Sequence, residues 1–247
     1  MMDQCALEAE NVAMTLGTGA AAVQALKGIS LSLLAGQLTI LMGPSGSGKS
    51  TLLAILGCIL TPTAGTVRVS GTATAGMDSE QLAAVRRQHI GFVFQSYNLF
   101  PGLTALDNVQ TGLAIRKREA RQSVETARLA LQSVGLGHKL AALPRQLSGG
   151  EQQRVAIARA IAGDPSIVLA DEPTAALDSV AGRTVMQQFR RLASEDGRAV
   201  LVVSHDARAL PFADRIVTME DGRILSDVTN AARTNTPDVS MGVSAHG

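Results

Sequence analysis

The feature that most restricts the fold of this chain is a glycine-rich segment of eight residues, Gly43-Pro44-Ser45-Gly46-Ser47-Gly48-Lys49-Ser50. It fits the pattern G-x-x-x-x-G-K-[ST], follows the apolar run 38–42 and precedes the helical run 50–56. Glycines let backbone N–H groups turn toward an anion, and the N-terminus of the following helix adds partial positive charge. The segment therefore predicts a polyphosphate site between a strand and a helix, built from Gly43, Pro44, Ser45, Gly46, Ser47, Gly48, Lys49, Ser50 and Thr51.

Two side chains of this segment have distinct expected roles. The Lys49 ammonium is placed to reach the β and γ phosphates of a bound nucleotide. The Ser50 hydroxyl is placed to coordinate Mg²⁺. We therefore expect Mg²⁺ to accompany the polyphosphate.

Short β-rich runs alternate with helical patterns along the chain, which indicates an α/β fold. Two of these runs, 167–170 and 199–203, are apolar throughout and predict central parallel strands that are covered on both faces. Apolar residues at helical spacing over 119–134 indicate a helical subdomain, inserted at about 96–162. The strands that we expect are 29–33, 38–42, 66–69, 91–94, 167–170, 199–203 and 215–219.

Titratable residues follow the two apolar strands. Asp171 and Glu172 come directly after one strand, and His205 follows the other after a single serine. The carboxyl ends of parallel strands form the edge at which ligands bind in such sheets. We expect Asp171 to hold Mg²⁺, Glu172 to orient and polarise an attacking water, and His205 to contact the γ-phosphate.

The segment Leu147-Ser148-Gly149-Gly150-Glu151-Gln152 directly precedes a helical run, which we expect to begin near Glu151. The hydroxyl of Ser148 and the N–H groups of Gly149 and Gly150 predict a second anion site at the N-terminus of that helix. This segment resembles the signature of the ABC ATPase family. The resemblance implies that the signature of one subunit closes on the nucleotide held by the phosphate loop of another, so that two ATP molecules are enclosed in a head-to-tail dimer.

Other motifs agree with this resemblance over residues 7–227. Gln95 resembles the Q-loop glutamine that senses Mg²⁺ or the attacking water, and Asp178 lies in a segment resembling the D-loop that contacts nucleotide in the dimer. The resemblance implies a phosphate-loop NTPase fold of the RecA-like type, with a mainly parallel sheet core, an antiparallel β portion and the inserted helical subdomain. Residues 228–247 are expected to form a disordered tail because they show little apolar periodicity.

One position departs from the family pattern. Many relatives place an aromatic residue against the adenine ring, and here Leu16 stands at the corresponding position. An aliphatic side chain can cover a purine but lacks the stacking contribution of about 1 kcal/mol, so contact with the base is expected to be weaker or to come from elsewhere, and the choice between ATP and GTP stays open.

Composition limits the classes of partner. The 22 Lys and Arg residues balance 21 Asp and Glu, the aromatic content is 2%, and we expect no nucleic acid partner. The N-terminus shows no secretory signal and the longest apolar runs are of strand length, so we expect a cytoplasmic chain that is peripheral on the inner face of the cell membrane.

The segments 57–60, 170–179 and 219–223 resemble ATPases of the bacterial lipoprotein-release, macrolide-efflux and heterocyst-glycolipid exporters, the last type most of all. The resemblance implies a membrane permease partner, a periplasmic adaptor reached through it, and export of a lipid, lipoprotein or hydrophobic compound. Two alternatives stay open from the sequence: the ATPase of an ABC importer and a soluble ABC ATPase outside transport.

Overall fold

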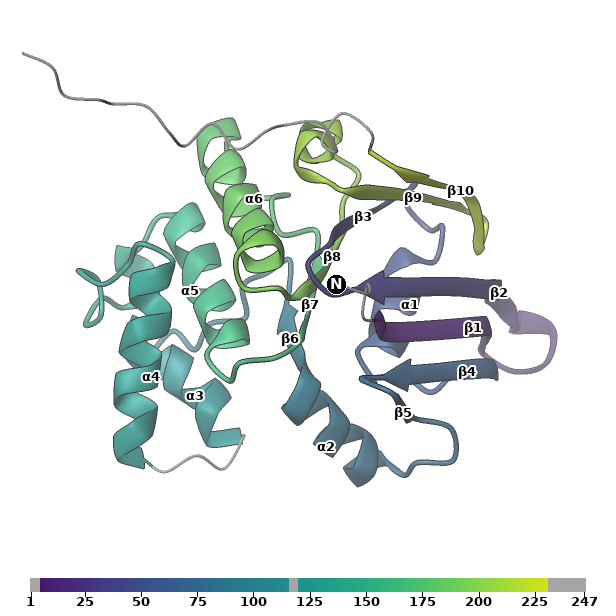
Figure 1. Ribbon diagram of the computed structural model, residues 1–247, viewed down its shortest axis with the longest axis horizontal. Helices are drawn as coiled ribbons and strands as arrows, with labels where there is room; N and C mark the ends of the chain where they lie inside the picture. Colours follow the sequence, from purple (N-terminus) through teal and green to yellow (C-terminus); the bar gives the residue numbers. More distant parts are fainter. Residues whose placement is uncertain (1–4, 116–119, 231–247) are drawn as a thin grey trace, which may run out of the picture.

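The computed structural model describes residues 5–115 and 120–230. Its main sheet has six strands in the order β10-β9-β3-β8-β7-β6 (Figure 1). Pairing is parallel from β9 through β6, and only β10 runs antiparallel to its neighbour. The strands are β3 (Leu38–Met42), β6 (Ile90–Val93), β7 (Ile167–Asp171), β8 (Ala199–Val203), β9 (Arg215–Glu220) and β10 (Arg223–Thr229).

A second sheet of four antiparallel strands lies beside the first, in the order β2-β1-β4-β5 (Figure 1). Register shifts between β1 and β2 mark bulges in the long pair, and bulges increase the local twist of a ribbon. The strands are β1 (Cys5–Leu16), β2 (Val23–Leu34), β4 (Ala64–Val69) and β5 (Thr72–Ala73).

Helices cover both faces of the parallel sheet. Helix α1 lies between the two sheets, whereas α3, α4, α5 and α6 lie on the other side of the parallel sheet (Figure 1). Helices α3, α4 and α5 all fall within the segment 96–162 and follow one another between β6 and β7. The helices are α1 (Lys49–Leu56), α2 (Ser79–His89), α3 (Ala105–Ile115), α4 (Ala120–Ser133), α5 (Gly149–Ile161) and α6 (Ser179–Ser194), with single 3₁₀ turns at Gly19–Ala21 and Pro144–Gln146 and a longer one at Ala207–Phe212.

The core consists of two apolar clusters, one on each face of the parallel sheet. Side chains alternate between the faces of a strand, so Val200 and Val202 of β8 join the cluster under α3–α6. Leu201 and Val203 join the cluster under α1 and the antiparallel sheet. Burial on both faces explains why the central strands are apolar at every position.

The structure confirms the α/β architecture and corrects several expected boundaries. β2 begins at Val23 rather than near residue 29, and β1, β5 and β10 are three strands that the apolar pattern did not predict. Helix α5 begins at Gly149 rather than near Glu151, since Ser148 caps it. The tail was predicted to begin at residue 228, but β10 extends to Thr229. Residues 231–247, which make up most of the predicted tail, lie outside the described residues.

None of the helices that the structure describes combines the length and the apolarity that a bilayer crossing requires.

Candidate functional site

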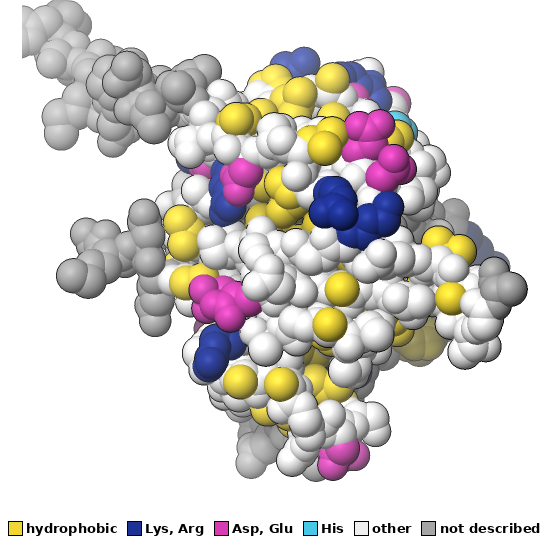
Figure 2. Space-filling view, turned by 90° about the vertical axis from the view of Figure 1, so that its right-hand side faces the viewer, with side chains coloured by type: hydrophobic (Ala, Val, Ile, Leu, Met, Phe, Trp, Pro, Cys, Tyr) yellow, Lys and Arg dark blue, Asp and Glu magenta, His cyan; other side chains and the backbone are white. Residues whose placement is uncertain are grey.

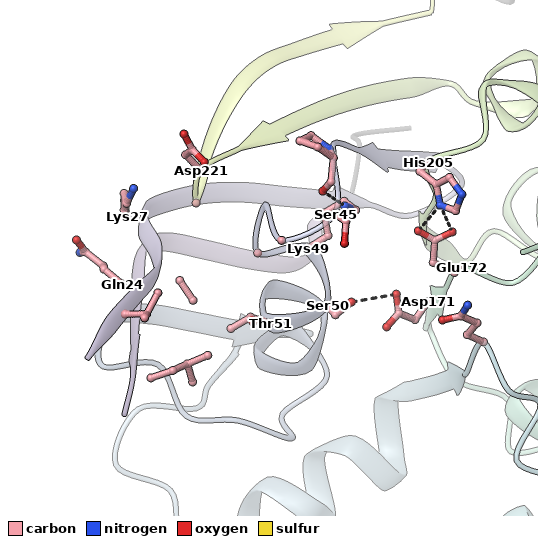
Figure 3. A pocket seen from close by; sticks show the side chains of 18 residues that line it. Gln24, Lys27, Ser45, Lys49, Ser50, Thr51, Asp171, Glu172, His205 and Asp221 are labelled. Carbon is pink, nitrogen blue, oxygen red and sulfur yellow. Dashed lines mark hydrogen bonds and ion pairs between the residues drawn. The ribbon is translucent and has the colours of Figure 1, made fainter. Parts of the chain in front are cut away.

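A cavity of about 970 Å³ opens where the two sheets meet. Its walls come from the ends of β1 and β2, the loop before α1, and the carboxyl ends of β6, β7 and β8 (Figure 3). The strand order places β3 next to β8 and β8 next to β7, which brings the expected residues to one edge. The cavity lining includes Pro44, Ser45, Gly46, Gly48, Lys49, Ser50, Thr51, Gln95, Asp171, Glu172 and His205.

At two of its glycines, the backbone of the glycine-rich loop packs too closely on its neighbours to accommodate a Cβ. Gly48 has a φ of 97°, and a Cβ there would lie 2.6 Å from the Ala25 carbonyl oxygen. A Cβ on Gly43 would lie 2.1 Å from the carbonyl oxygen of Met219. The Ser47 carbonyl accepts a hydrogen bond from Gly222 N at 3.1 Å, which fixes the loop to the turn between β9 and β10. Glycine is therefore required for the packing of the loop as well as for its turn.

The N-terminus of α1 lines the cavity. Gly48 is the N-cap and offers no side chain to accept from them, so these N–H groups remain available to an anion. Lys49 is buried, and its ammonium donates to the carbonyl oxygens of Gly43 at 2.8 Å and Pro44 at 2.7 Å. It also donates to Ser47 Oγ at 3.3 Å. The loop thus holds a buried positive charge at its centre.

Two oxygen atoms that could coordinate a cation lie close together near the Lys49 ammonium. Ser50 Oγ donates to Asp171 Oδ1 at 3.4 Å (Figure 3). Burial raises the pKa of the Asp171 carboxyl, and the Glu172 charge adds to that effect, whereas the Ser50 hydrogen bond and Lys49 oppose it. A hydroxyl and a carboxylate are donors that Mg²⁺ accepts. The pair fits a cation that also contacts phosphate oxygens.

Glu172 and His205 form a direct pair at the same end of the cavity (Figure 3). His205 Nδ1 lies 2.8 Å from Glu172 Oε1 and 2.7 Å from Oε2. Glu172 has a φ of 47°, and its N–H donates to the Val203 carbonyl oxygen at 3.0 Å. The His205 side chain is 66% exposed and that of Glu172 17% exposed. The expected contact of His205 with a γ-phosphate stays a prediction, while the structure assigns its Nδ1 to the carboxylate.

The opposite end of the cavity is lined by residues of the antiparallel sheet and the β9–β10 turn. Figure 3 shows Gln24, Lys27 and Asp221 far from Glu172 and His205, with the phosphate loop between the two groups. Leu16 and Val23 are cross-strand partners that line the same end, and both are substantially exposed. The sequence analysis predicted Leu16 at the site but did not predict Val23, Gln24, Lys27 and Asp221, because no motif marks such positions in a β-ribbon or in the β9–β10 turn.

The signature segment lies elsewhere: Ser148, Gly149 and Gly150 do not line this cavity. Ser148 Oγ accepts from Glu151 N at 3.2 Å, and Glu151 Oε2 accepts from Ser148 N at 2.8 Å, which makes a capping box. A Cβ on Gly150 would lie 2.9 Å from the Ala181 Cβ. Gly150 therefore lets α5 pack closely on α6.

Asp178 also lies outside the cavity. It is the N-cap of α6, and its Oδ1 accepts from Val180 N at 2.8 Å and Ala181 N at 2.9 Å. These backbone hydrogen bonds lower the pKa of the Asp178 carboxyl. Within one chain Asp178 acts as a helix cap, and its expected contact with nucleotide stays a prediction.

Comparison with known proteins accounts for both the cavity and the separate signature segment. The model of the family described as "ABC transporter" matches residues 26–175, which is more than half of the chain. The chain belongs to the ABC transporter ATP-binding family. The matched range begins in β2 and includes the phosphate loop, the signature segment and the acidic pair of this ABC ATPase, whereas His205 lies beyond it.

Individual relatives agree. The ABC transporter ATP-binding protein MJ0796 of Methanocaldococcus jannaschii is 45% identical to this ABC ATPase, over 88% of the chain and 94% of the relative. The macrolide export ATP-binding/permease protein MacB of Rhodopirellula baltica is 48% identical, over 85% of the chain but 31% of the relative. The chain thus spans about a third of the length of that macrolide export protein.

Solved structures show the same fold. The structure described as a dimeric post-hydrolysis state of the MJ0796 cassette, bound to ADP and Pi, superimposes with a TM-score of 0.83 at 42% identity, covering 90% of this chain and 98% of that one. A structure of cbiO1 from Clostridium perfringens gives a TM-score of 0.82 at 26% identity, covering 92% and 89%. The chain is therefore an ABC-type ATPase, and its relatives confirm the predicted resemblance to macrolide-efflux ATPases.

Proposed function

We propose that this ABC ATPase is the motor subunit of a transporter, acting as a head-to-tail dimer with a separate membrane permease that exports a lipid, lipoprotein or hydrophobic compound. The observation that carries the proposal is the separation of two anion sites within one chain. The phosphate loop lines the cavity with Glu172 and His205, whereas the helix N-terminus at Ser148 lies outside it. A second copy is needed to bring the two sites together.

The triphosphate binds along the glycine-rich loop. Its β and γ phosphates accept from the α1 N-terminal amides and from the Lys49 ammonium, which exchanges its carbonyl partners for phosphate oxygens. Ser50 and Asp171 would hold Mg²⁺, and Gln95, which lines the same cavity, would be a further ligand. When bound, Mg²⁺ neutralises charge on the phosphate oxygens.

Glu172 acts as the general base. Its carboxylate takes a proton from a water as that water oxygen forms a bond to the γ-phosphorus and the bond to the ADP oxygen breaks. His205 Nδ1, 2.8 Å from Glu172 Oε1, holds this carboxylate in its orientation. Gln95, which lines the cavity, orients the water or contacts the cation.

Dimerisation places the signature of the second copy over the γ-phosphate. The Ser148 hydroxyl accepts within the capping box, so its hydrogen remains free to be donated to an anion. The amides of Gly149 and Gly150 stand beside it at the helix N-terminus. Asp178, at the N-terminus of α6, lies in the segment that would face the partner. The dimeric structure of the MJ0796 relative supports this arrangement.

A groove of about 320 Å³ supports a permease partner. It is lined by aromatic and cationic residues of β6, α2, α5 and the loop after β6, among them Arg86, Arg87, Phe94, Phe100 and Arg159. Phe94 and Phe100 are exposed, which is typical of interaction sites. The MacB relative combines an ATP-binding part with a permease and is named for export. These facts support export through a permease, and the proposal adds a location on the inner face of the membrane and an adaptor reached through the permease.

Nucleic acid is a poor fit as a partner. On the face shown in Figure 2, Lys and Arg side chains lie in small groups beside Asp and Glu rather than in a continuous basic surface. The near-neutral balance of charges points the same way.

The test is Glu172→Gln in the full chain, tagged and purified from its own membranes with Mg·ATP. We expect this variant to bind ATP, to form a stable dimer and not to turn over, because the amide cannot accept the proton. A permease should be retained with it, and a periplasmic adaptor would support export. Normal turnover would remove Glu172 as the base, and recovery of soluble proteins only would contradict the transporter role.

A further inference from the structure

A second pocket lies between α6 and the 3₁₀ segment Ala207–Phe212. Its volume is about 170 Å³, whereas the pockets of drug-sized ligands measure ~300–1,000 Å³. It shares no lining residue with the nucleotide cavity. The chain therefore has a separate space that fits a small molecule only.

Part of the lining of this pocket is apolar. Met186 of α6 and Ala209 of the 3₁₀ segment are each 2% exposed, and Phe212 also belongs to the lining. Gly182 keeps the space open, because a Cβ there would have no atom closer than the Thr174 Cβ at 3.7 Å. Hydrocarbon that enters the pocket is removed from water, which favours binding.

The polar part of the lining presents donors without acceptors. The Arg183 guanidinium forms no hydrogen bond or ion pair with any residue that the structure describes. Thr174 is 6% exposed, and its hydroxyl has no partner among the described residues although it is not sealed from solvent. Ser179 Oγ accepts from Arg208 Nη1 at 2.7 Å, so its hydrogen is free to be donated. These three donors favour a ligand that carries acceptor atoms.

Asp206 is the one carboxylate of the lining, and Arg208 neutralises it. Arg208 Nε donates to Asp206 Oδ1 at 3.0 Å and to Oδ2 at 2.8 Å, and Arg208 Nη2 lies 2.8 Å from Oδ2. The hydrogen bond from the Arg208 side chain is the main cause that lowers the pKa of the Asp206 carboxyl. Arg183 therefore supplies a positive charge that no carboxylate of the lining matches.

The pocket adjoins the two chain segments that continue from Glu172 and His205. Thr174 follows Glu172 by two residues, and Asp206 directly follows His205. The hydrogen bond from Arg208 joins the 3₁₀ segment to the first residue of α6. A ligand in the pocket therefore contacts both segments without entering the nucleotide cavity.

We propose that this pocket binds a small organic carboxylate with a short hydrocarbon chain. The carboxylate accepts from the Arg183 guanidinium and from the hydroxyls of Thr174 and Ser179, in charge-assisted hydrogen bonds that are stronger than neutral ones. The hydrocarbon chain lies against Met186 and Phe212. This inference goes beyond the proposed function and does not rest on it, because it requires neither dimerisation nor hydrolysis.

The probe is 6,6,6-trifluorohexanoate, observed by ¹⁹F NMR in titrations of the full chain. Saturating Mg·ADP is present, so that the phosphate loop is occupied and cannot take the carboxylate. We expect a Kd of about 1 mM, since a small ligand makes few contacts. The amide of the same acid keeps the chain and loses the charge, so it should bind at least ~tenfold more weakly.

Variants locate the binding site. Arg183→Gln should weaken binding of the carboxylate at least ~tenfold, whereas Arg183→Lys keeps the charge and should keep part of the affinity. Gly182→Leu should block binding by filling the pocket. Arg191→Gln removes the same charge from α6, but Arg191 pairs with Glu195 at the surface, so this matched control should keep the parental Kd. Melting temperatures without the carboxylate report whether each variant is folded.

Four results would overturn the proposal: no binding of the carboxylate at ~20 mM, equal affinity for the carboxylate and its amide, a parental Kd in Arg183→Gln, or an equal loss of affinity in Arg191→Gln. Binding that disappears when Mg·ADP is added would place the carboxylate on the phosphate loop and would overturn it as well. If Gly182→Leu does not fold, the two Arg183 variants decide. Failure of the chain to bind Mg·ADP is a separate result, which would count against the proposed function but leave the comparison of Arg183 with Arg191 intact.

Discussion

Replacing Gly48 by alanine tests whether the phosphate loop depends on close packing or only on backbone freedom. Gly48 has a φ of 97°, and a Cβ there would meet the Ala25 carbonyl oxygen at 2.6 Å and Leu26 Cδ2 at 2.9 Å. Gly46, in the same loop, has a φ of 80° and nothing within 4 Å of an added Cβ. The two substitutions therefore share the backbone penalty and differ in the clash.

The magnitudes follow from these contacts. A left-handed alanine costs about 1 kcal/mol in either position, and overpacking against a backbone oxygen adds about 1–3 kcal/mol at Gly48 only. Gly46→Ala should lower the free energy of unfolding by about 1 kcal/mol, and Gly48→Ala by about 2–4 kcal/mol. At roughly 3 °C for each kcal/mol in a chain of this size, the expected shifts in Tm are about 3 °C and 6–12 °C.

Urea unfolding without nucleotide, followed by far-UV circular dichroism, measures both values. The absence of nucleotide separates stability from the loss of binding that either change also causes. Equal destabilisation by the two variants would refute the argument that contact with β2 holds the loop.

Three further predictions concern other parts of the chain. Lys49→Met should weaken binding of Mg·ATP at least tenfold in calorimetry, because the loop loses its buried charge beside the β and γ phosphates; unchanged affinity would contradict that placement. Ser148→Arg should leave ATP binding to each monomer intact but abolish ATP-dependent dimerisation in light scattering, and a dimer formed by that variant would exclude the head-to-tail arrangement. Cys58 is buried, and burial raises its pKa to about 11, so the thiol stays protonated at pH 8. It should react with Ellman's reagent much more slowly than the exposed Cys5 until denaturant is added. Equal rates in the native state would show that Cys58 is accessible to solvent.

The sequence predicted the central strands closely, because strands buried on both faces must be apolar at every position. The strand at 199–203 has the predicted bounds, and that at 167–170 extends by one residue to Asp171. β10 escaped prediction because it is an exposed edge strand whose pairing with β9, rather than an apolar face, sets its position. β1 mixes acidic and apolar residues and contains a left-handed Asn11, so it shows no regular alternation.

For the site, the sequence predicted that Lys49, the acidic pair and His205 share the cavity. It did not predict how these residues contact one another. The Glu172–His205 pair depends on a left-handed Glu172 that turns its carboxylate toward the neighbouring strand end. No sequence pattern specifies that dihedral angle. Likewise, Ser148 and Asp178 cap the helices that follow them. The spacing of residues in the sequence is compatible with this capping role and with direct contact to a nucleotide, so it could not decide between the two.

Strands of two sheets that share no strand line the cavity, the antiparallel sheet at one end only. Leu16 and Val23 belong to the antiparallel sheet, whereas Asp171 ends a strand of the parallel one. A nucleotide that contacts both sheets links them. Its binding free energy therefore opposes separation of the sheets as well as global unfolding. Hydrogen exchange should then slow in both sheets when ATP binds, and free phosphate, which reaches only one end, should protect only the strands around its own loop.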